Sequence, residues 1–192
     1  MTELATFEEM ELRIVTATKA IQAQQGKFDA ANTRLNRTQE GAKLAGAELI
    51  RLSDELENAR LRDVEQYVAA LVDGTKKPDL SALSKLTAER ERAEFAVAHT
   101  VRKIPVVRAA ALEEESLLCD CHASLRYAEA ELERAKALRA FESVSGEFGE
   151  GATLEVKGSS WQRLTELGDQ LIHASRSLRR QSQELLTGST GR

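Results

Sequence analysis

Apolar residues recur at a seven-residue spacing over most of this chain. The first series starts at Phe7 and continues without interruption to Leu56. Its members are Phe7, Ile14, Ile21, Phe28, Leu35, Ala42, Leu49 and Leu56. Because seven residues make two helical turns, this series predicts one apolar stripe along a long α-helix that needs a partner helix.

End signals mark the limits of this first helix. Thr6 and Glu9 have the spacing of a capping box, in which each side chain bonds the backbone N–H of the other residue. At the other end, Gly74 suits a C-terminal cap and Pro78 cannot continue a helix. The sequence therefore predicts a helix from Phe7 to about Val72, followed by a turn at 73–79.

A second stripe with the same spacing follows this turn. Asp79 or Ser81 can cap its helix, which we expect to run to about Val144. The members of the stripe are Leu83, Arg90, Val97, Ile104, Ala111, Leu118, Leu125 and Leu132. Since a short turn joins the two long helices, they should pack as antiparallel neighbours.

The polar interruptions of the two stripes suggest a register. If the chain folds back between Lys76 and Lys77, Asp63 faces Arg90, and these two residues carry opposite charges. The same register places Leu56 opposite Val97. It also brings His99 close to Asp54.

Two residues disfavour straight helices. Pro105 removes a backbone hydrogen bond and clashes with the carbonyl of Val101, so we expect a kink or break there. Gly26 lies in a polar stretch of the first helix and costs about 1 kcal/mol relative to Ala. The first helix is therefore also expected to split near Gly26.

The remainder of the chain contains one further helix. Residues 146–158 form a Gly-rich linker in which 153–157 alternate as a short strand would. A capping box at Ser159 and Gln162 opens a helix over 159–187, and 188–192 should fray. The predicted fold is all-α: an Ala-rich antiparallel coiled-coil hairpin over 1–145, kinked near Pro105, with a C-terminal amphipathic helix after the linker.

Composition and charge agree with long helices and disfavour several classes of protein. Aromatic residues are only 4% of the chain, whereas charged residues are 30%, with a net charge of −4. This balance lacks the basic excess of a general nucleic-acid binder. The sequence shows neither a signal peptide nor an apolar run long enough to span a membrane. We therefore expect a cytoplasmic protein, or a virion protein assembled in the cytoplasm.

The residues that could carry chemistry do not form a catalytic or metal-binding set. Cys119, Cys121 and His122 resemble a metal motif, but residues two apart on a helix point in different directions. Reduced thiols at small core positions are the simpler interpretation. A His99–Asp54 pair without a nucleophile indicates a surface contact. The sequence therefore predicts a protein that is not an enzyme and holds no cofactor or metal.

The predicted function is that of a structural or assembly protein acting through helix–helix contacts. A small, Ala-rich, non-catalytic hairpin would suit a bacteriophage virion or its assembly, with a second copy or another protein as the partner. The last helix offers the candidate contact residues, an apolar face that starts at Trp161 and a basic cluster. These residues are Trp161, Leu164, Leu171, Leu178, Arg176, Arg179 and Arg180.

Two alternative functions remain open at this point. A regulator or adaptor would contact nucleic acid or a protein through the C-terminal helix. A membrane-surface protein would lay its first helical arm on lipid, although Glu8, Glu9 and Glu11 disfavour anionic lipid. In architecture, without a shared motif, the layout is broadly similar to that of the phage-shock and ESCRT-III proteins.

Overall fold

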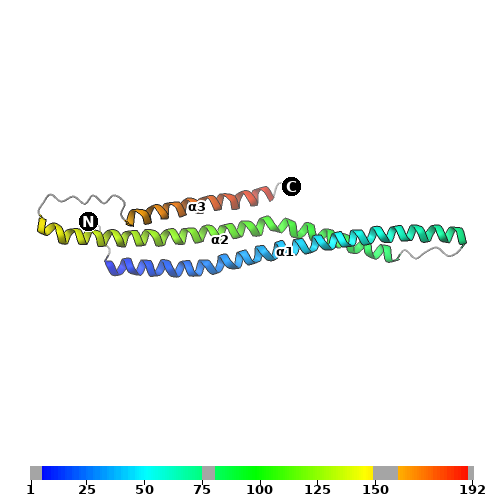
Figure 1. The fold of residues 1–192 in the computed structure, drawn as a ribbon, viewed down its shortest axis with the longest axis horizontal. Helices are drawn as coiled ribbons and strands as arrows, with labels where there is room; N and C mark the ends of the chain where they lie inside the picture. Colours follow the sequence, from blue (N-terminus) through cyan, green and yellow to red (C-terminus); the bar gives the residue numbers. More distant parts are fainter. Residues whose placement is uncertain (1–5, 75–80, 149–159, 190–192) are drawn as a thin grey trace. The chain divides into compact units, whose positions relative to one another are not determined.

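The computed structural model describes residues 6–74, 81–148 and 160–189, which form three α-helices. Helix α1 spans Phe7–Asp73, α2 spans Ser81–Phe148 and α3 spans Ser160–Ser189 (Figure 1). The long helices pack against each other, as expected for a helical hairpin. The all-α fold class predicted from the sequence is therefore confirmed.

The start and end of α1 agree with the predicted signals. The backbone N–H of Thr6 donates to Glu9 Oε2 at 2.8 Å, and the N–H of Glu9 donates to Thr6 Oγ1 at 3.3 Å. These two bonds are the predicted capping box. Gly74 has a φ of +66°, a left-handed conformation that suits glycine after a helix. The rest of the predicted turn, at 75–80, lies outside the described residues.

Some expectations about the continuity of the helices were wrong. Helix α1 does not split near Gly26. Helix α2 continues through Pro105, so the alternative of a break there was wrong, whereas the expected kink stays a prediction. Helix α2 also runs on to Phe148, so the predicted linker does not begin at Gly146. Packing along a long helix evidently outweighs the local cost of one Gly or Pro. The predicted short strand at 153–157 and the cap at Ser159 lie outside the described residues.

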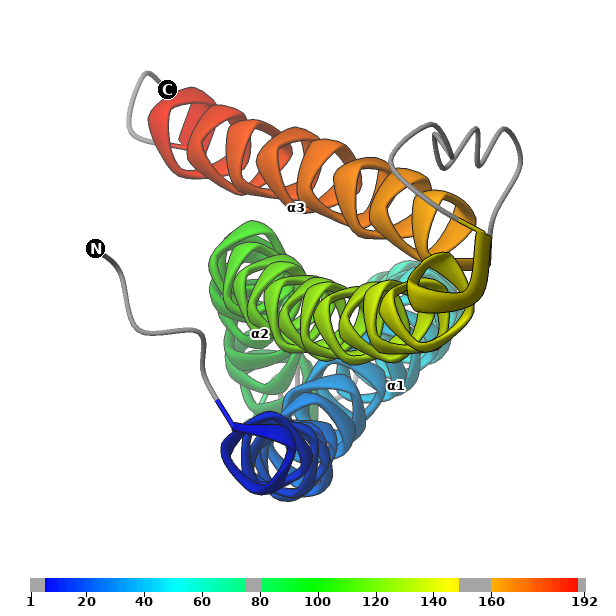
Figure 2. The ribbon, with the colours of Figure 1, turned by 90° about the vertical axis from the view of Figure 1, so that its left-hand side faces the viewer.

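The chain divides into two compact parts. The three-helix part contains α1 up to Asn32, α2 from Arg108 onward, and α3. Within it, α2 lies between α1 and α3 (Figure 2). The two-helix part, Thr33–Val107, contains the rest of α1 and the beginning of α2.

The predicted stripes form the cores of both parts. Each residue of the two series is buried or half-buried, including the polar Arg90. Among the described residues of the two-helix part, Leu52 and Leu56 are the buried apolar ones. In the three-helix part, Ala111 and Leu132 are buried, and Met10 joins them from α1. The seven-residue pattern therefore identified the faces that pack.

The predicted register of the hairpin was wrong. Arg90 was expected to face Asp63, but its Nε donates to Ser53 Oγ at 3.4 Å. The observed partner in α1 therefore lies ten residues closer to the start of that helix than the expected one. Arg90 also pairs with Glu94 on its own helix at 3.7 Å. The expected proximity of His99 to Asp54 followed from the same register. The His99 ring instead stacks on Phe95, with 6.1 Å between ring centroids.

Candidate interaction surfaces

Helix α3 packs on α2 through small residues at a seven-residue spacing. On α2 these are Ala109, Ser116, Ala123 and Ala130, all of them buried. On α3 the corresponding residues are Gly168, Ser175 and Ser182, also buried. Ser116 Oγ and Ser175 Oγ share a hydrogen bond of 3.0 Å, and Ser182 Oγ donates to the carbonyl of Ala109 at 2.9 Å. Small side chains allow the two helix backbones to approach closely, and the two hydrogen bonds fix their register.

The closest approach is at Gly168. A Cβ built on this residue would lie 2.9 Å from two carbons of the Tyr127 ring. The Tyr127 hydroxyl donates to Asp169 Oδ1 at 2.7 Å, which holds the ring over the glycine. The same bond raises the pKa of the Tyr127 hydroxyl, because ionisation would place two negative charges together.

The basic cluster predicted on α3 is only partly available to a partner. Arg179 pairs with Asp120 of α2 through Nη2 and Oδ2. The side chains of Arg176 and Arg180 are exposed. Since Asp120 already neutralises one of the three arginines, the cluster is a weaker candidate for a phosphate-binding surface than the sequence indicated.

The predicted apolar contact residues of α3 lie on the side that faces the chain's own helices. Leu164, Leu171 and Leu178 are half-buried. Leu164 lines one small pocket together with Ile14 of α1 and Leu132 of α2. Trp161 is also half-buried, with the Arg134 guanidinium 5.7 Å from its ring centroid. Their role in binding another molecule stays a prediction.

A buried polar contact joins α1 to α2 in the three-helix part. The Gln24 side chain is buried, and its Nε2 donates to the carbonyl of Glu114 at 3.2 Å and to Glu114 Oε2 at 2.6 Å. Nearer the start of α1, Arg13 pairs with Glu131 at 3.1 Å on the surface. A buried amide that finds its hydrogen-bond partners in just one alignment of the two helices stabilises that alignment relative to neighbouring registers.

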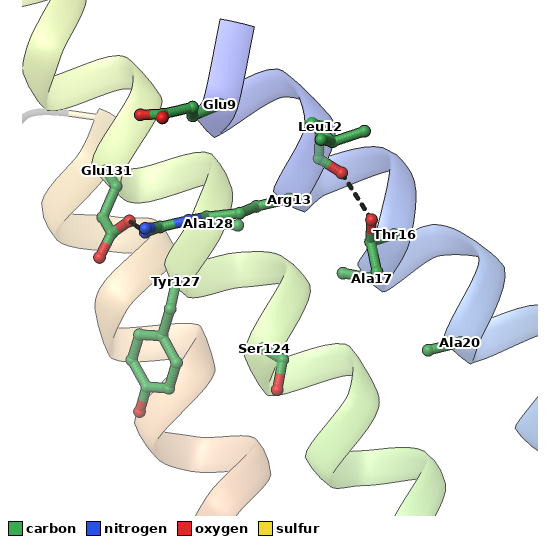
Figure 3. A pocket seen from close by; sticks show the side chains of 10 residues that line it. All are labelled: Glu9, Leu12, Arg13, Thr16, Ala17, Ala20, Ser124, Tyr127, Ala128 and Glu131. Atoms are coloured by element: carbon green, nitrogen blue, oxygen red, sulfur yellow. Dashed lines mark hydrogen bonds and ion pairs between the residues drawn. The ribbon is translucent and has the colours of Figure 1, made fainter. Parts of the chain in front are cut away.

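A groove of about 710 Å³ lies between α1 and α2 beside the Arg13–Glu131 pair (Figure 3). Its lining consists mainly of small and polar side chains, with Leu12 at its edge. Arg13 reaches across it to Glu131, whereas the Tyr127 hydroxyl points away towards α3. The lining residues are Glu9, Leu12, Arg13, Thr16, Ala17, Ala20, Ser124, Tyr127, Ala128 and Glu131. The hydroxyls of the lining donate to other groups: Thr16 to the carbonyl of Leu12 at 2.8 Å, Ser124 to the carbonyl of Asp120 at 2.9 Å, and Tyr127 to Asp169.

The two-helix part exposes large apolar side chains near the end of α1. Because the two helices are antiparallel, each step forward along α1 corresponds to one step back along α2. Nine residues after Ser53, Arg62 therefore lies level with Ser81, the first residue of α2, which is nine residues before Arg90. The α1 residues after Arg62 therefore run past the start of α2, as Figure 1 also shows. The exposed apolar residues at this end of α1 are Leu61, Val64, Tyr67, Val68, Leu71 and Val72. Sequence reasoning missed this surface because it assigned α1 a partner along its whole length.

The cysteines and histidines do not come together around a shared point. Cys119 and Cys121 are free thiols and half-buried. Burial, with smaller effects from Glu115 and Asp120, raises the pKa of the Cys119 thiol. Among the described residues, no three His, Cys, Asp or Glu side chains are placed to hold a metal ion. No helix in that portion of the chain is long and apolar enough to cross a bilayer.

Comparisons with known proteins add no family to these observations. No family model, curated protein or solved structure matches the chain.

Proposed function

We propose that this chain is a non-enzymatic structural or assembly protein that acts through helix–helix contacts. The observation that carries this proposal is the apolar surface near the end of α1. Its large side chains are exposed at a spacing typical of a helix that packs against another helix. The inward stripes, in contrast, are already used between the helices of the chain itself.

The surroundings of this surface also support a binding role. The two-helix part has a small core, in which Leu52 and Leu56 are the fully buried apolar residues among those that the structure describes. A partner that covers the exposed side chains would add apolar burial that the hairpin cannot provide alone. The more specific proposal is that the partner belongs to a bacteriophage virion or its assembly apparatus, which suits a small Ala-rich helical protein.

The test is whether the chain occupies an assembly of fixed composition in its native host. Particles and complexes should be separated by sedimentation, and the chain should be quantified by mass spectrometry across the fractions. We expect a constant copy number relative to one or more companion proteins in a large assembly. If the chain sediments as a free monomer throughout infection or growth, the proposed function is wrong.

A further inference from the structure

The end of α1 carries a complete two-heptad stripe on its outer face. Leu61, Val64, Val68 and Leu71 have exposed fractions of 61%, 62%, 53% and 62%. Their spacing of three, four and three residues is that of the a and d positions of a coiled coil. Earlier in α1, the row of residues that faces α2 contains Ala59. Leu61 follows Ala59 by two residues, so it lies on the opposite side of the helix from this row. Helix α2 therefore leaves this stripe open.

We propose that a second copy of this chain packs on the stripe to form a short, parallel, two-stranded coiled coil. This inference rests on the proposed function and names its partner. In such a dimer, Leu61 and Val68 occupy a positions, and Val64 and Leu71 occupy d positions. Each of the four residues then meets its own equivalent in the second copy.

The flanking charges favour a second copy and the parallel orientation. In a parallel coil, the residue before an a position faces the residue that lies five positions later in the partner. Arg60 then faces Glu65 of the second copy, and Tyr67 faces Val72. In an antiparallel coil the same rows would place Arg60 beside Tyr67 and Glu65 beside Val72, without a charge pair. The sequence around the stripe is therefore self-complementary in one orientation.

The charged residues that precede the stripe limit the length of the coil. The two preceding positions of the stripe are Asp54 and Glu57. Two parallel copies would bring these like charges together, so the helices should diverge before Leu61. An interface of two heptads is short, and we expect a dimer that dissociates on dilution in the micromolar range.

Charge exchange tests the predicted pairing directly. The full chain should be followed by sedimentation equilibrium from about 1 to about 300 μM, a range that brackets a micromolar dissociation constant. Arg60→Glu and Glu65→Arg should each raise this constant about fivefold or more, and the double variant should restore dimerisation. If both single variants weaken the dimer and the double variant does not recover, the parallel pairing is wrong.

Disulfide formation provides a second, geometric readout. In a C119S/C121S background, Val64→Cys should form a disulfide-linked dimer rapidly, because position 64 meets position 64 of the second copy. Gln66→Cys is the matched control, since residue 66 lies on the side away from the coil. Equal rates for the two variants would overturn the proposed interface.

A pair of matched double variants separates loss of the interface from loss of the helix. Val64→Glu with Val68→Glu adds two charges on the stripe, whereas Gln66→Glu with Ala69→Glu adds two charges beside it. Only the first pair should abolish dimerisation, with equal helicity by circular dichroism. A wild-type chain that stays monomeric up to the highest concentration overturns this inference alone. The proposed function would still stand if the native assembly contains a different companion at fixed copy number.

Discussion

At the scale of single residues, Gly168 explains how α3 comes close to α2. Glycine inside a helix costs about 1 kcal/mol relative to alanine, so it needs a compensating reason. The reason here is the Tyr127 ring, which lies 2.9 Å from the position that a Cβ would take. The bond from Tyr127 to Asp169 keeps the ring in that place.

A double-mutant cycle should reveal this steric conflict. Gly168→Ala alone should destabilise the protein by about 1 kcal/mol, because relief of the clash requires the ring to move and the bond to Asp169 to break. In a Tyr127→Ala background, the same substitution should stabilise by about 1 kcal/mol, the ordinary helical preference for alanine. Urea unfolding of the four proteins gives both values. A Gly168→Ala effect that is the same in both backgrounds would contradict the contact.

Cys119 should react more slowly than an unburied cysteine. Its pKa is raised, so a smaller fraction of the thiol is ionised at a given pH, and the thiolate is the nucleophile. In a Cys121→Ser variant, the rate of alkylation by iodoacetamide at pH 8 should therefore fall below that of a cysteine-containing model peptide. Unfolding in urea should remove the difference. A native rate equal to that of the peptide would contradict the raised pKa of the Cys119 thiol.

At the scale of helices, features set by neighbouring residues were predicted correctly, whereas the alignment of one helix against another was not. The cap at Thr6 and the seven-residue stripes depend on neighbouring residues and were read directly from the sequence. The register was not, because a repeating stripe offers several alignments that bring apolar layers together. The opposite charges of Asp63 and Arg90 favoured one of these alignments, although Arg90 in fact bonds Ser53.

The contact between α3 and α2 was missed for a related reason. Large apolar residues, such as Leu164 and Leu171, indicated the packing face of α3 in the sequence, whereas its buried row is built from Gly168, Ser175 and Ser182. The signal was present as small residues at a seven-residue spacing. It becomes informative only when the equally spaced small residues of α2 are recognised as its counterpart.

Enlarging one residue of this row should displace α3. Ala123 has no exposed surface, so Ala123→Leu should overpack the contact and cost about 1–3 kcal/mol. The emission of Trp161, the single tryptophan, should then shift to longer wavelength as its half-buried ring becomes more exposed. Ala110→Leu makes the same change at an exposed position of α2 and should leave the emission unaltered. Equal spectra for both variants would show that α3 does not depend on this row.

At the scale of the whole molecule, the two compact parts have cores of different composition. The three-helix part buries small residues from three helices and contains hydrogen bonds such as Ser116–Ser175 and Gln24–Glu114. The two-helix part relies on Leu52 and Leu56, with the half-buried Ser53–Arg90 contact beside them. Less burial per helix predicts that the two-helix part opens more readily.

Hydrogen exchange measured by mass spectrometry should detect this difference. In the wild-type protein at a concentration that keeps it monomeric, amides of 33–73 and 81–107 should exchange faster than those of 108–140. Leu56→Ala removes a buried side chain and should cost about 2–5 kcal/mol, chiefly as faster exchange within the two-helix part. Leu132→Ala is the matched change in the three-helix part and should accelerate exchange there instead. Each of the two long helices passes through both cores. If either substitution accelerated exchange equally in both parts, α1 and α2 would unfold as single units from end to end, and the expected independent opening of the two-helix part would be wrong.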